Sequence, residues 1–567
     1  MLYWNKMKHI LIILVIGFLV YANILPNQFV WDDEEQIVKN PLVQNLSNLP
    51  LIFKSSTFYG GGGTPTGWFY RPMMTLSYLL NYWAWGGRPF GFHLFQVIIH
   101  LLNSVFIFLI FSRIFSREKI SNSRLISFLM ALVFVVHPAN VEAVSYIAAL
   151  QESLYTLFGL VVLFILTRVK DLQLKNYFLL GILVLLSLLS KESAVFIIPL
   201  IFVFLILYQK EKVGYWLGFS VTAVLVYLFL RLGIAKIPLF APNVGPVAES
   251  SLIQRLITIP YEIVSYLRII FFPKDLFICQ HALISNISDF RFWGYLALLG
   301  MLGMLGVCWG IRLKSKAFFF FVFWFFGALF LVLNIIPLDM TVAERWLYFP
   351  FIGFLGMVGI ILGEVIRAFP KVFLSNLFLF CLVVLFSCLS LRTIIRNSSW
   401  HDGLTLYGHD VLLNPNAFDL QNNYGVELFR AGRLEEAKIH FERSIELYPR
   451  WWFAYNNLGV VYERKGDLAQ ARRLYEQTIK ISDYYLAYEN LAFLMLKTEP
   501  LPETIKFVEE GLEKLPLNTR LRTVLVVAYY RDNRYDQALI EAKRLFQLNP
   551  TLQNQQLLEA IIRREKI

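Results

Sequence analysis

Long apolar runs separated by short polar segments make up roughly the first 395 residues of the chain. A helix that crosses a bilayer needs about 20 mostly apolar residues, and shorter runs suffice when polar flanks extend the helix. We therefore predict an all-α, polytopic membrane domain at 1–395, with a large first outer loop at 26–91. Its eleven predicted spans are 9–25, 92–112, 125–137, 148–168, 176–190, 194–208, 214–232, 292–311, 317–336, 346–367 and 372–392.

Basic residues in the connecting segments indicate how these spans are oriented. Cytoplasmic loops carry an excess of lysine and arginine, and the basic clusters fall on one side if the spans simply alternate. We expect a cytoplasmic N-terminus and an extracytoplasmic C-terminal region. Counting the apolar segment 252–272 as a span would reverse this pattern, so we interpret it as an interfacial or re-entrant helix. The clusters are Lys6/Lys8, 113–124, Arg168/Lys170/Lys175, Lys210/Lys212, Arg312/Lys314/Lys316 and Arg367/Lys371.

Beyond Trp400 the apolar spacing changes to the 3.6-residue period of amphipathic helices, with a longer repeat superimposed. The clearest unit runs Tyr455-x2-Leu458-Gly459-x2-Tyr462, and Gly425 lies 34 residues before Gly459. This pattern is typical of tetratricopeptide repeats, whose helix pairs stack into an α-solenoid. We predict a linker at 396–417, four repeat units at 418–451, 452–484, 485–518 and 519–552, and a capping helix at 553–567.

Composition agrees with a chain that is mostly in lipid. Of its 567 residues 57% are hydrophobic and only 16% charged, whereas soluble domains carry about 25% charged residues. The net charge of +12 sits in the membrane part, because residues 1–400 hold 30 Lys+Arg against 17 Asp+Glu and residues 401–567 hold 22 against 23. We therefore expect membrane lipid and no nucleic acid as a partner.

Ionisable residues gather near the predicted outer ends of the spans. Such groups are costly at membrane depth and usually face a protein interior or a wet cavity. Their convergence on one face is what an extracytoplasmic active site requires, while helix caps and structural ion pairs are the plainer alternative. The residues are Asp32, Asp33, His93, His137, Glu142, Lys191, Glu192, Glu344 and Arg345, with Arg71 in the first outer loop.

Several short motifs together resemble the transmembrane and tetratricopeptide repeat-containing family of protein O-mannosyltransferases and its prokaryotic relatives. The resemblance covers almost the whole chain, including the order of membrane part and repeats, and it suggests a bacterial or archaeal cytoplasmic membrane. The motifs are Phe29-Val30-Trp31-Asp32-Asp33, Asn40-Pro41, Tyr70-Arg71-Pro72, Gly91-Phe92-His93, His100, His137-Pro138-x3-Glu142-Ala143-Val144, Lys191-Glu192 and Glu344-Arg345-x2-Tyr348-x-Pro350.

This resemblance implies a GT-C glycosyltransferase fold, which takes a sugar from a polyprenyl phosphate and transfers it on the outer or lumenal side. It also implies that an acidic residue in the first outer loop is the base, and that motif falls on Asp32 and Asp33. Sugar transfer to a hydroxyl needs a general base, which a carboxylate supplies when correctly placed. Relatives differ in donor and acceptor, so the fold does not fix mannose or protein as partners.

The leaving group of such a transfer is a phosphate anion, which fixed cations stabilise. We predict Arg71, Lys191 and Arg345 as ligands of the donor phosphate. No cofactor is certain beyond the lipid-linked sugar donor; a divalent metal fits the acidic run, but no arrangement requires one and we assign no metal ligand. Supporting roles are predicted for His93, His137, Glu142, Glu192 and Glu344.

The leading prediction is a membrane glycosyltransferase that moves a mannose-like sugar onto an extracytoplasmic acceptor. The acceptor is a protein or glycan that the repeats recruit in their groove, with Trp451, Trp452, Tyr455 and Tyr484/Tyr485 as candidate lining residues. Two alternatives stay open: a non-catalytic, membrane-anchored scaffold for envelope assembly, and a ligase or transporter of lipid-linked glycans. The latter predicts charges at the bilayer midplane instead of at one surface.

Overall fold

The computed structural model of the chain describes residues 2–58, 67–169, 172–240, 245–373 and 375–565. The predicted all-α fold is confirmed: the only extended pairing in these ranges is one antiparallel bridge between Gln280 and Val342. Two compact units make up the chain, the first ending at Leu413 and the second beginning at Asn414.

The first unit consists of helices joined by 3-10 and π turns. In chain order its helices are α1 (Leu2–Tyr21), α2 (Leu49–Ile52), α3 (Pro72–Trp85), α4 (Pro89–Arg117), α5 (Ser123–Val136), α6 (Val141–Ser145), α7 (Leu150–Arg168), α8 (Leu174–Leu188), α9 (Ile197–Tyr208), α10 (Val213–Leu228), α11 (Pro246–Glu249), α12 (Leu252–Phe271), α13 (Phe290–Leu313), α14 (Lys316–Phe330), α15 (Tyr348–Ala368), α16 (Pro370–Phe373), α17 (Asn376–Ser399) and α18 (Gly403–Leu413).

Each of the eleven predicted apolar runs overlaps a helix of this unit. Seven helical segments are long and apolar enough to cross a membrane: 6–24, 89–117, 147–168, 210–234, 290–310, 344–368 and 376–399. A bent pair, α5 with the segment 138–145, passes the same test with a break of 53°. The remaining runs correspond to the shorter apolar helices of α8, α9 and α14. Helix α12 is not among these segments, and it contains Pro260 in its interior.

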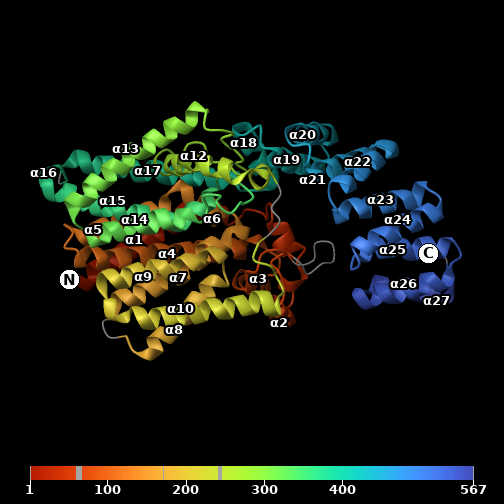
Figure 1. Cartoon of the computed structure of the whole chain (residues 1–567), viewed down its shortest axis with the longest axis horizontal. Helices are drawn as coiled ribbons and strands as arrows, with labels where there is room; N and C mark the ends of the chain where they lie inside the picture. The colour runs from red at the N-terminus through yellow and green to blue at the C-terminus, as the bar shows by residue number, and fades with distance from the viewer. Residues whose placement is uncertain (1, 59–66, 170–171, 241–244, 374, 566–567) are drawn as a thin grey trace. The chain divides into compact units, whose positions relative to one another are not determined.

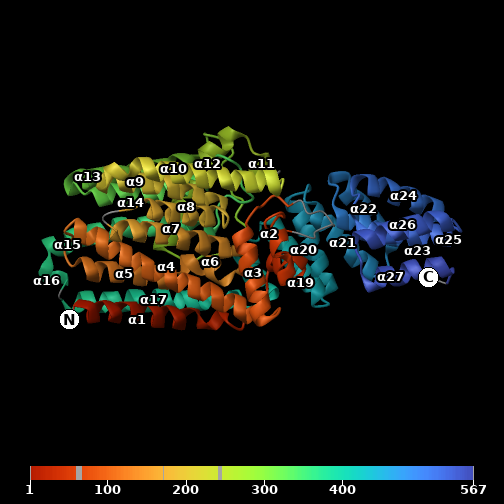
Figure 2. The same ribbon diagram turned by 90° about the horizontal axis from the view of Figure 1, so that it is seen from below.

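The long helices of the first unit run roughly parallel to one another (Figures 1 and 2). Helix α4 packs against α1, α5 and α7, and α1 also contacts α17 along one edge. Helix α14 packs against α15 and α9. In both views α2, α3 and α6 lie at one end of the bundle, while the N-terminus and α16 lie at the other. The predicted basic clusters and the candidate acidic residues therefore occupy opposite ends of the same helices.

Glycines let α15 approach its aromatic neighbours closely. A Cβ added at Gly356 would meet Cδ1 of Phe321 in α14 at 2.2 Å, and one added at Gly353 would meet the backbone nitrogen of Phe325 at 2.6 Å. Phe321 and Phe325 are both buried. The tight contact between α14 and α15 thus depends on residues without side chains on one face of α15.

The junction after α17 belongs to the first unit. Arg396 and Asp410 are fully buried and joined by two hydrogen bonds, of 2.6 Å to Oδ1 and 3.0 Å to Oδ2. Asp410 also accepts a hydrogen bond from the Ile278 backbone N–H at 2.9 Å. Burial alone would raise the pKa of Asp410, but the Arg396 guanidinium outweighs burial and holds that pKa below its usual value. The segment 396–417, which the sequence pattern predicts to be a linker, therefore begins with packed structure.

The second unit is a solenoid of helix pairs. Its helices are α19 (Phe418–Arg430), α20 (Leu434–Leu447), α21 (Trp452–Arg464), α22 (Leu468–Ile481), α23 (Tyr485–Thr498), α24 (Leu501–Lys514), α25 (Thr519–Arg531), α26 (Tyr535–Leu548) and α27 (Leu552–Arg563).

Small residues and amides set the spacing of this solenoid. A Cβ at Gly459 in α21 would meet Cε1 of Tyr475 in α22 at 2.6 Å, so the helices of this pair cross where only glycine fits. Successive pairs are joined by amides: Asn457 donates to Oδ1 of Asn422 at 2.9 Å, and Asn490 donates to Oδ1 of Asn456 at 3.0 Å. The first helices of neighbouring pairs are thus linked by side-chain hydrogen bonds.

Candidate active site

The acidic pair follows the first membrane helix, in a tight turn. Trp31 adopts a positive φ of 57°, which reverses the chain just before Asp32 and Asp33. Asp33 is completely buried; its Oδ2 accepts the Val30 backbone N–H at 3.0 Å and its Oδ1 accepts the Ala148 N–H at 2.7 Å. Burial raises the pKa of Asp33, and the two backbone N–H groups oppose that rise. Both oxygens of Asp33 are therefore occupied in holding the loop against the segment before α7.

Asp32 differs from its neighbour because its side chain is only partly buried. Tyr146 and the cation of Arg345 lie within electrostatic range of its carboxylate. Burial raises the pKa of Asp32, and Tyr146 and Arg345 lower it by smaller amounts. Of the two acids, Asp32 is the one that no backbone N–H group of the described residues engages, so it is the better placed to take a proton.

Aromatic rings line the turn that carries Asp32 and Asp33. The Trp31 and Tyr146 rings stack at 5.1 Å and 14°, and Tyr146 stacks in turn on Trp400 at 5.5 Å and 24°. The Arg345 guanidinium lies 5.4 Å from the centroid of the Trp31 ring. A cation over an aromatic face is attracted by the ring quadrupole, so Trp31 helps to hold Arg345 beside the acidic pair.

Glu142 is the ion-pair partner of Arg345. Its Oε1 pairs with the Arg345 guanidinium, and its Oε2 accepts the Arg345 backbone N–H at 2.9 Å. Glu142 is 1% exposed and Arg345 9%. Glu344, also buried, has no hydrogen-bond partner for either carboxylate oxygen among the described residues, and the cations Arg396 and Arg392 lie within electrostatic range of it. Glu142 therefore fixes the position of Arg345, whereas Glu344 does not.

The two other predicted phosphate ligands are also paired with acids. Nε of Arg71 donates to Glu192 at 3.2 Å, and Arg231 binds the second oxygen of the same carboxylate at 3.2 Å. Nζ of Lys191 pairs with Glu152. Burial lowers the pKa of Lys191, and the nearby cations Arg71 and Arg345 lower it further. Glu152 opposes this lowering of the pKa. Lys191 thus lies within electrostatic range of both Arg71 and Arg345, and each of the three cations lies beside one carboxylate.

The two histidines proposed as supporting residues are both buried. Nδ1 of His137 accepts the Ala139 backbone N–H at 3.1 Å, so Nε2 carries the proton and donates to the Ile270 carbonyl at 3.0 Å. His93 is buried in the first turns of α4, next to the backbone of Asn27 and Gln28. Both nitrogens of His137 are occupied, which leaves it no free position for proton transfer.

Several residues of this cluster were not predicted as site residues. Glu152 is visible in the sequence only as an acid inside a predicted span, and Arg231 only as a basic residue near the end of another. Tyr146 and Trp400 carry no charge and stand out in no motif. Asp339 lies within electrostatic range of both Asp32 and Arg345. An ionisable residue inside an apolar run is the one signal that identifies Glu152 and Arg231 as interior groups.

The described residues contain no group of three or more His, Cys, Asp or Glu side chains that could hold a metal ion. What they bring together is an aspartate at the edge of an aromatic wall and three cations, each with one carboxylate partner. A guanidinium has five N–H donors, so pairing with one carboxylate leaves Arg345 and Arg71 able to bind further anionic oxygens. The arrangement can accept a proton and stabilise a phosphate within one cluster.

Comparisons with known proteins agree on both halves of the chain. A family model described as tetratricopeptide repeat matches residues 416–483. "Protein O-mannosyl-transferase F38B6.6" of Caenorhabditis elegans is 26% identical over 454 residues, which cover 78% of this chain and 63% of that protein. "Protein O-mannosyl-transferase TMTC3" of Homo sapiens is 25% identical over 495 residues, covering 78% of this chain and 52% of that protein. This chain therefore spans about half to three fifths of the length of these relatives.

Among solved structures, the tetratricopeptide repeat protein YrrB, described as having an unusual peptide-binding site, matches 28% of this chain and 82% of its own. The two share 16% identity with a TM-score of 0.24.

Proposed function

We propose that this chain, a homologue of proteins named protein O-mannosyl-transferases, is a membrane glycosyltransferase that uses a polyprenyl-phosphate sugar. In this proposal it has a GT-C fold and acts in a bacterial or archaeal cytoplasmic membrane, on the extracytoplasmic side. The observation that carries the proposal is the partly buried Asp32 beside Arg345, at one end of a bundle of apolar helices. A lipid-linked donor presents its phosphate at the membrane surface, where the apolar helices end.

The chemistry assigns one role to each group. The acceptor hydroxyl oxygen forms a bond to the anomeric carbon while the bond from that carbon to the phosphate oxygen breaks. Asp32 takes the hydroxyl proton, as a general base. The polyprenyl phosphate leaves with the additional negative charge, which Arg345, Lys191 and Arg71 stabilise.

Asp33 positions the base and does not share its role. Its two backbone hydrogen bonds, to Val30 and Ala148, fix the turn that presents Asp32. Glu142 does the same for Arg345 by holding both its guanidinium and its backbone N–H. The repeats bind the acceptor, and the aromatic residues Trp451 and Trp452, whose rings lie 5.8 Å apart, are candidates for that contact.

The test compares Asp32→Asn with Asp33→Asn in the purified full chain, by consumption of a labelled polyprenyl-phosphate sugar. Loss of a general base typically lowers a rate by about 10²–10⁴-fold. We expect Asp32→Asn to show such a loss while its thermal unfolding stays that of the wild type. Asp33→Asn is expected to lower the unfolding temperature, because an amide offers one acceptor oxygen where the carboxylate uses two.

The pH profile adds a second readout. Because burial raises the pKa of Asp32, the wild-type rate should fall on acidification at a higher pH than an ordinary aspartate would give. That acidic limb should be absent from the residual activity of Asp32→Asn. Full transfer activity in both variants would refute Asp32 as the general base. No consumption of the labelled donor by the wild type would instead favour a membrane-anchored scaffold.

A further inference from the structure

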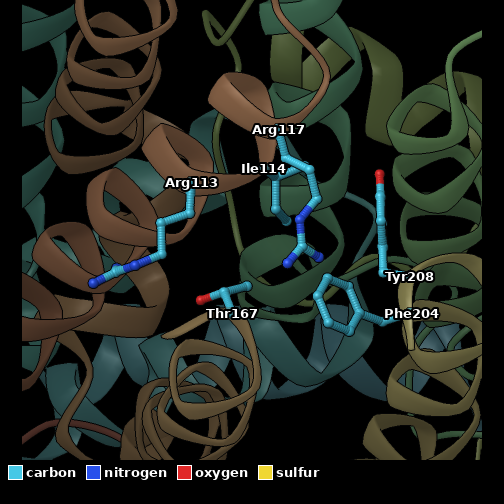
Figure 3. Close-up of a pocket in the computed structure, with 6 residues that line it drawn as sticks. All are labelled: Arg113, Ile114, Arg117, Thr167, Phe204 and Tyr208. Carbon is cyan, nitrogen blue, oxygen red and sulfur yellow. The ribbon is translucent and has the colours of Figure 1, made fainter. Parts of the chain in front are cut away.

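A second cluster of cations borders a pocket at the far end of α4. The pocket is lined by Arg113, Ile114 and Arg117 of α4, by Thr167 of α7, and by Phe204 and Tyr208 of α9 (Figure 3). In that view the side chain of Arg117 points between Thr167 and Phe204, and the guanidinium of Arg113 lies on the other side of Thr167. None of these residues takes part in the candidate active site.

Cations outnumber acids around this pocket among the residues that the structure describes. Lys6 lies within electrostatic range of Arg113, Arg124 and Arg168, and all four are cations. In the parts of the chain that the structure describes, Arg113 and Arg117 form no ion pair. Each instead lies over an aromatic ring, Arg113 at 4.5 Å from the Phe164 centroid and Arg117 at 5.2 Å from that of Tyr208.

The carboxylate beside this cluster, Glu118, is already engaged. Its Oε1 accepts the Tyr208 hydroxyl at 2.9 Å and its Oε2 accepts the Ser315 hydroxyl at 2.9 Å. Among the described residues, this carboxylate stands beside five cations, which leaves a surplus of positive charge: Lys6, Arg113, Arg117, Arg124 and Arg168. This contrasts with the other end of the bundle, where Arg71, Lys191 and Arg345 each have a carboxylate partner.

The pocket lies at the depth of lipid headgroups. Helix α4 has 29 residues and is therefore about 43 Å long, which exceeds the roughly 30 Å of a hydrocarbon core. His93 lies near its first residue and Arg117 is its last, so the two clusters face opposite surfaces of the membrane. Ile114 and Phe204, both buried, form an apolar floor next to the guanidinium groups.

We infer that this pocket binds the phosphate headgroup of an anionic phospholipid. Its enclosed space is about 20 Å³, little more than one water-sized group, so one phosphate oxygen enters beside Thr167 and the remaining headgroup lies at the mouth. Arg117, which lines the pocket, and Arg168, which follows Thr167 in the chain, are both exposed and available to that headgroup. Basic pockets between membrane helices are suited to such headgroups because guanidinium binds two phosphate oxygens at once.

The experiment measures retention of phosphatidylglycerol by the purified full chain, with native mass spectrometry and with thermal unfolding after lipid is added back. The variants are Arg117→Gln and Arg113→Gln/Arg117→Gln. Lys119→Gln, a charge loss at the same end but outside the pocket, and Arg88→Gln at the other end of α4 are the matched controls. Phosphatidylcholine and inorganic phosphate are run in parallel as alternative probes.

We expect phosphatidylglycerol affinity to fall about fivefold for one arginine and about 30-fold for both, from the contribution of each basic residue near a charged surface. The two controls should retain wild-type affinity, and phosphatidylcholine should not bind. Equal retention by the double variant, an equal loss in Lys119→Gln, or stabilisation by inorganic phosphate alone would each overturn the inference. The single variant replaces an exposed side chain, so it keeps the test open should the double variant fold poorly.

Discussion

Glu262 lies fully buried in α12, where only one of its carboxylate oxygens is satisfied. Its Oε1 accepts a hydrogen bond from the Asn334 amide at 3.0 Å, and its Oε2 has no partner among the described residues. Burial raises the pKa of Glu262 from 4.5 to about 8, against the smaller opposing effect of Asn334. Between these two values the folded protein keeps a proton that the unfolded chain releases.

We therefore predict that Glu262 makes folding less favourable as the pH rises from about 4.5 to about 8. The folded state binds more protons than the unfolded state over this interval, so the free energy of unfolding falls by up to about 1.4 kcal/mol per pH unit. Glu262→Gln removes this dependence, and its unfolding temperature relative to wild type should rise between about pH 5 and pH 8. Asp275→Asn, at a half-exposed position, is the control, and a Glu262→Gln difference that stays constant with pH would refute the assignment.

For single residues, the sequence identifies charged groups but not their partners. Glu142 and Arg345 stand out as ionisable residues beside apolar runs, yet 203 positions separate them and no spacing rule predicts that they pair. Arg231, near the end of a predicted span, resembles the basic residues that reach for the membrane surface. In the structure it donates to Glu192 and to the Pro238 carbonyl, at 3.2 and 2.8 Å. Such pairs form by tertiary packing, which a single sequence does not encode locally.

Helix α15 makes its contact with α14 through glycine, and this predicts a position-specific cost. In Gly356→Ala the new methyl group would lie 2.2 Å from Phe321, so the ring must move within a packed interior. Overpacking of this kind costs about 1–3 kcal/mol. Gly303 in α13 has nothing within 4 Å of the same added atom, so Gly303→Ala should be neutral or gain up to about 1 kcal/mol of helix propensity.

Thermal unfolding of the two variants in the same detergent provides the measurement. A lower midpoint for Gly356→Ala together with an unchanged or higher midpoint for Gly303→Ala is the expected result. Equal midpoints would mean that α14 and α15 do not pack as described.

The helices could be predicted from the sequence wherever a long apolar run specifies a helix by itself. The break between α5 and α6 also follows from sequence, because Pro138 removes a backbone donor and ends the helix before it. Helix α3, within the first outer loop, could not be predicted in this way. Its buried Met74 and Tyr78 pack against Phe92 and residues near Leu150, so tertiary contacts stabilise a segment whose own pattern is mixed.

The basic clusters and the candidate acidic residues lie at opposite ends of the membrane unit. This distribution of charge predicts the topology of the whole molecule. With native Cys308, Cys381 and Cys388 replaced, single cysteines at the exposed positions Leu46, Lys119 and Ile439 sample the first outer loop, the opposite end of the bundle and the repeats. A membrane-impermeant maleimide should label Leu46→Cys and Ile439→Cys in intact cells, and Lys119→Cys only after permeabilisation. Labelling of Leu46→Cys and Ile439→Cys from opposite sides would refute the proposed mechanism, since the acidic pair and the repeats must share a compartment.

The buried pairing of Arg396 with Asp410 decides where the molecule can be divided. Losing one partner of a buried ion pair typically costs about 3–5 kcal/mol, because the remaining charge stays away from water. A gene fragment that stops inside this junction would therefore leave the membrane unit with an orphaned guanidinium. Anyone who wishes to express the two halves separately should cut after Leu413, where the first compact unit ends.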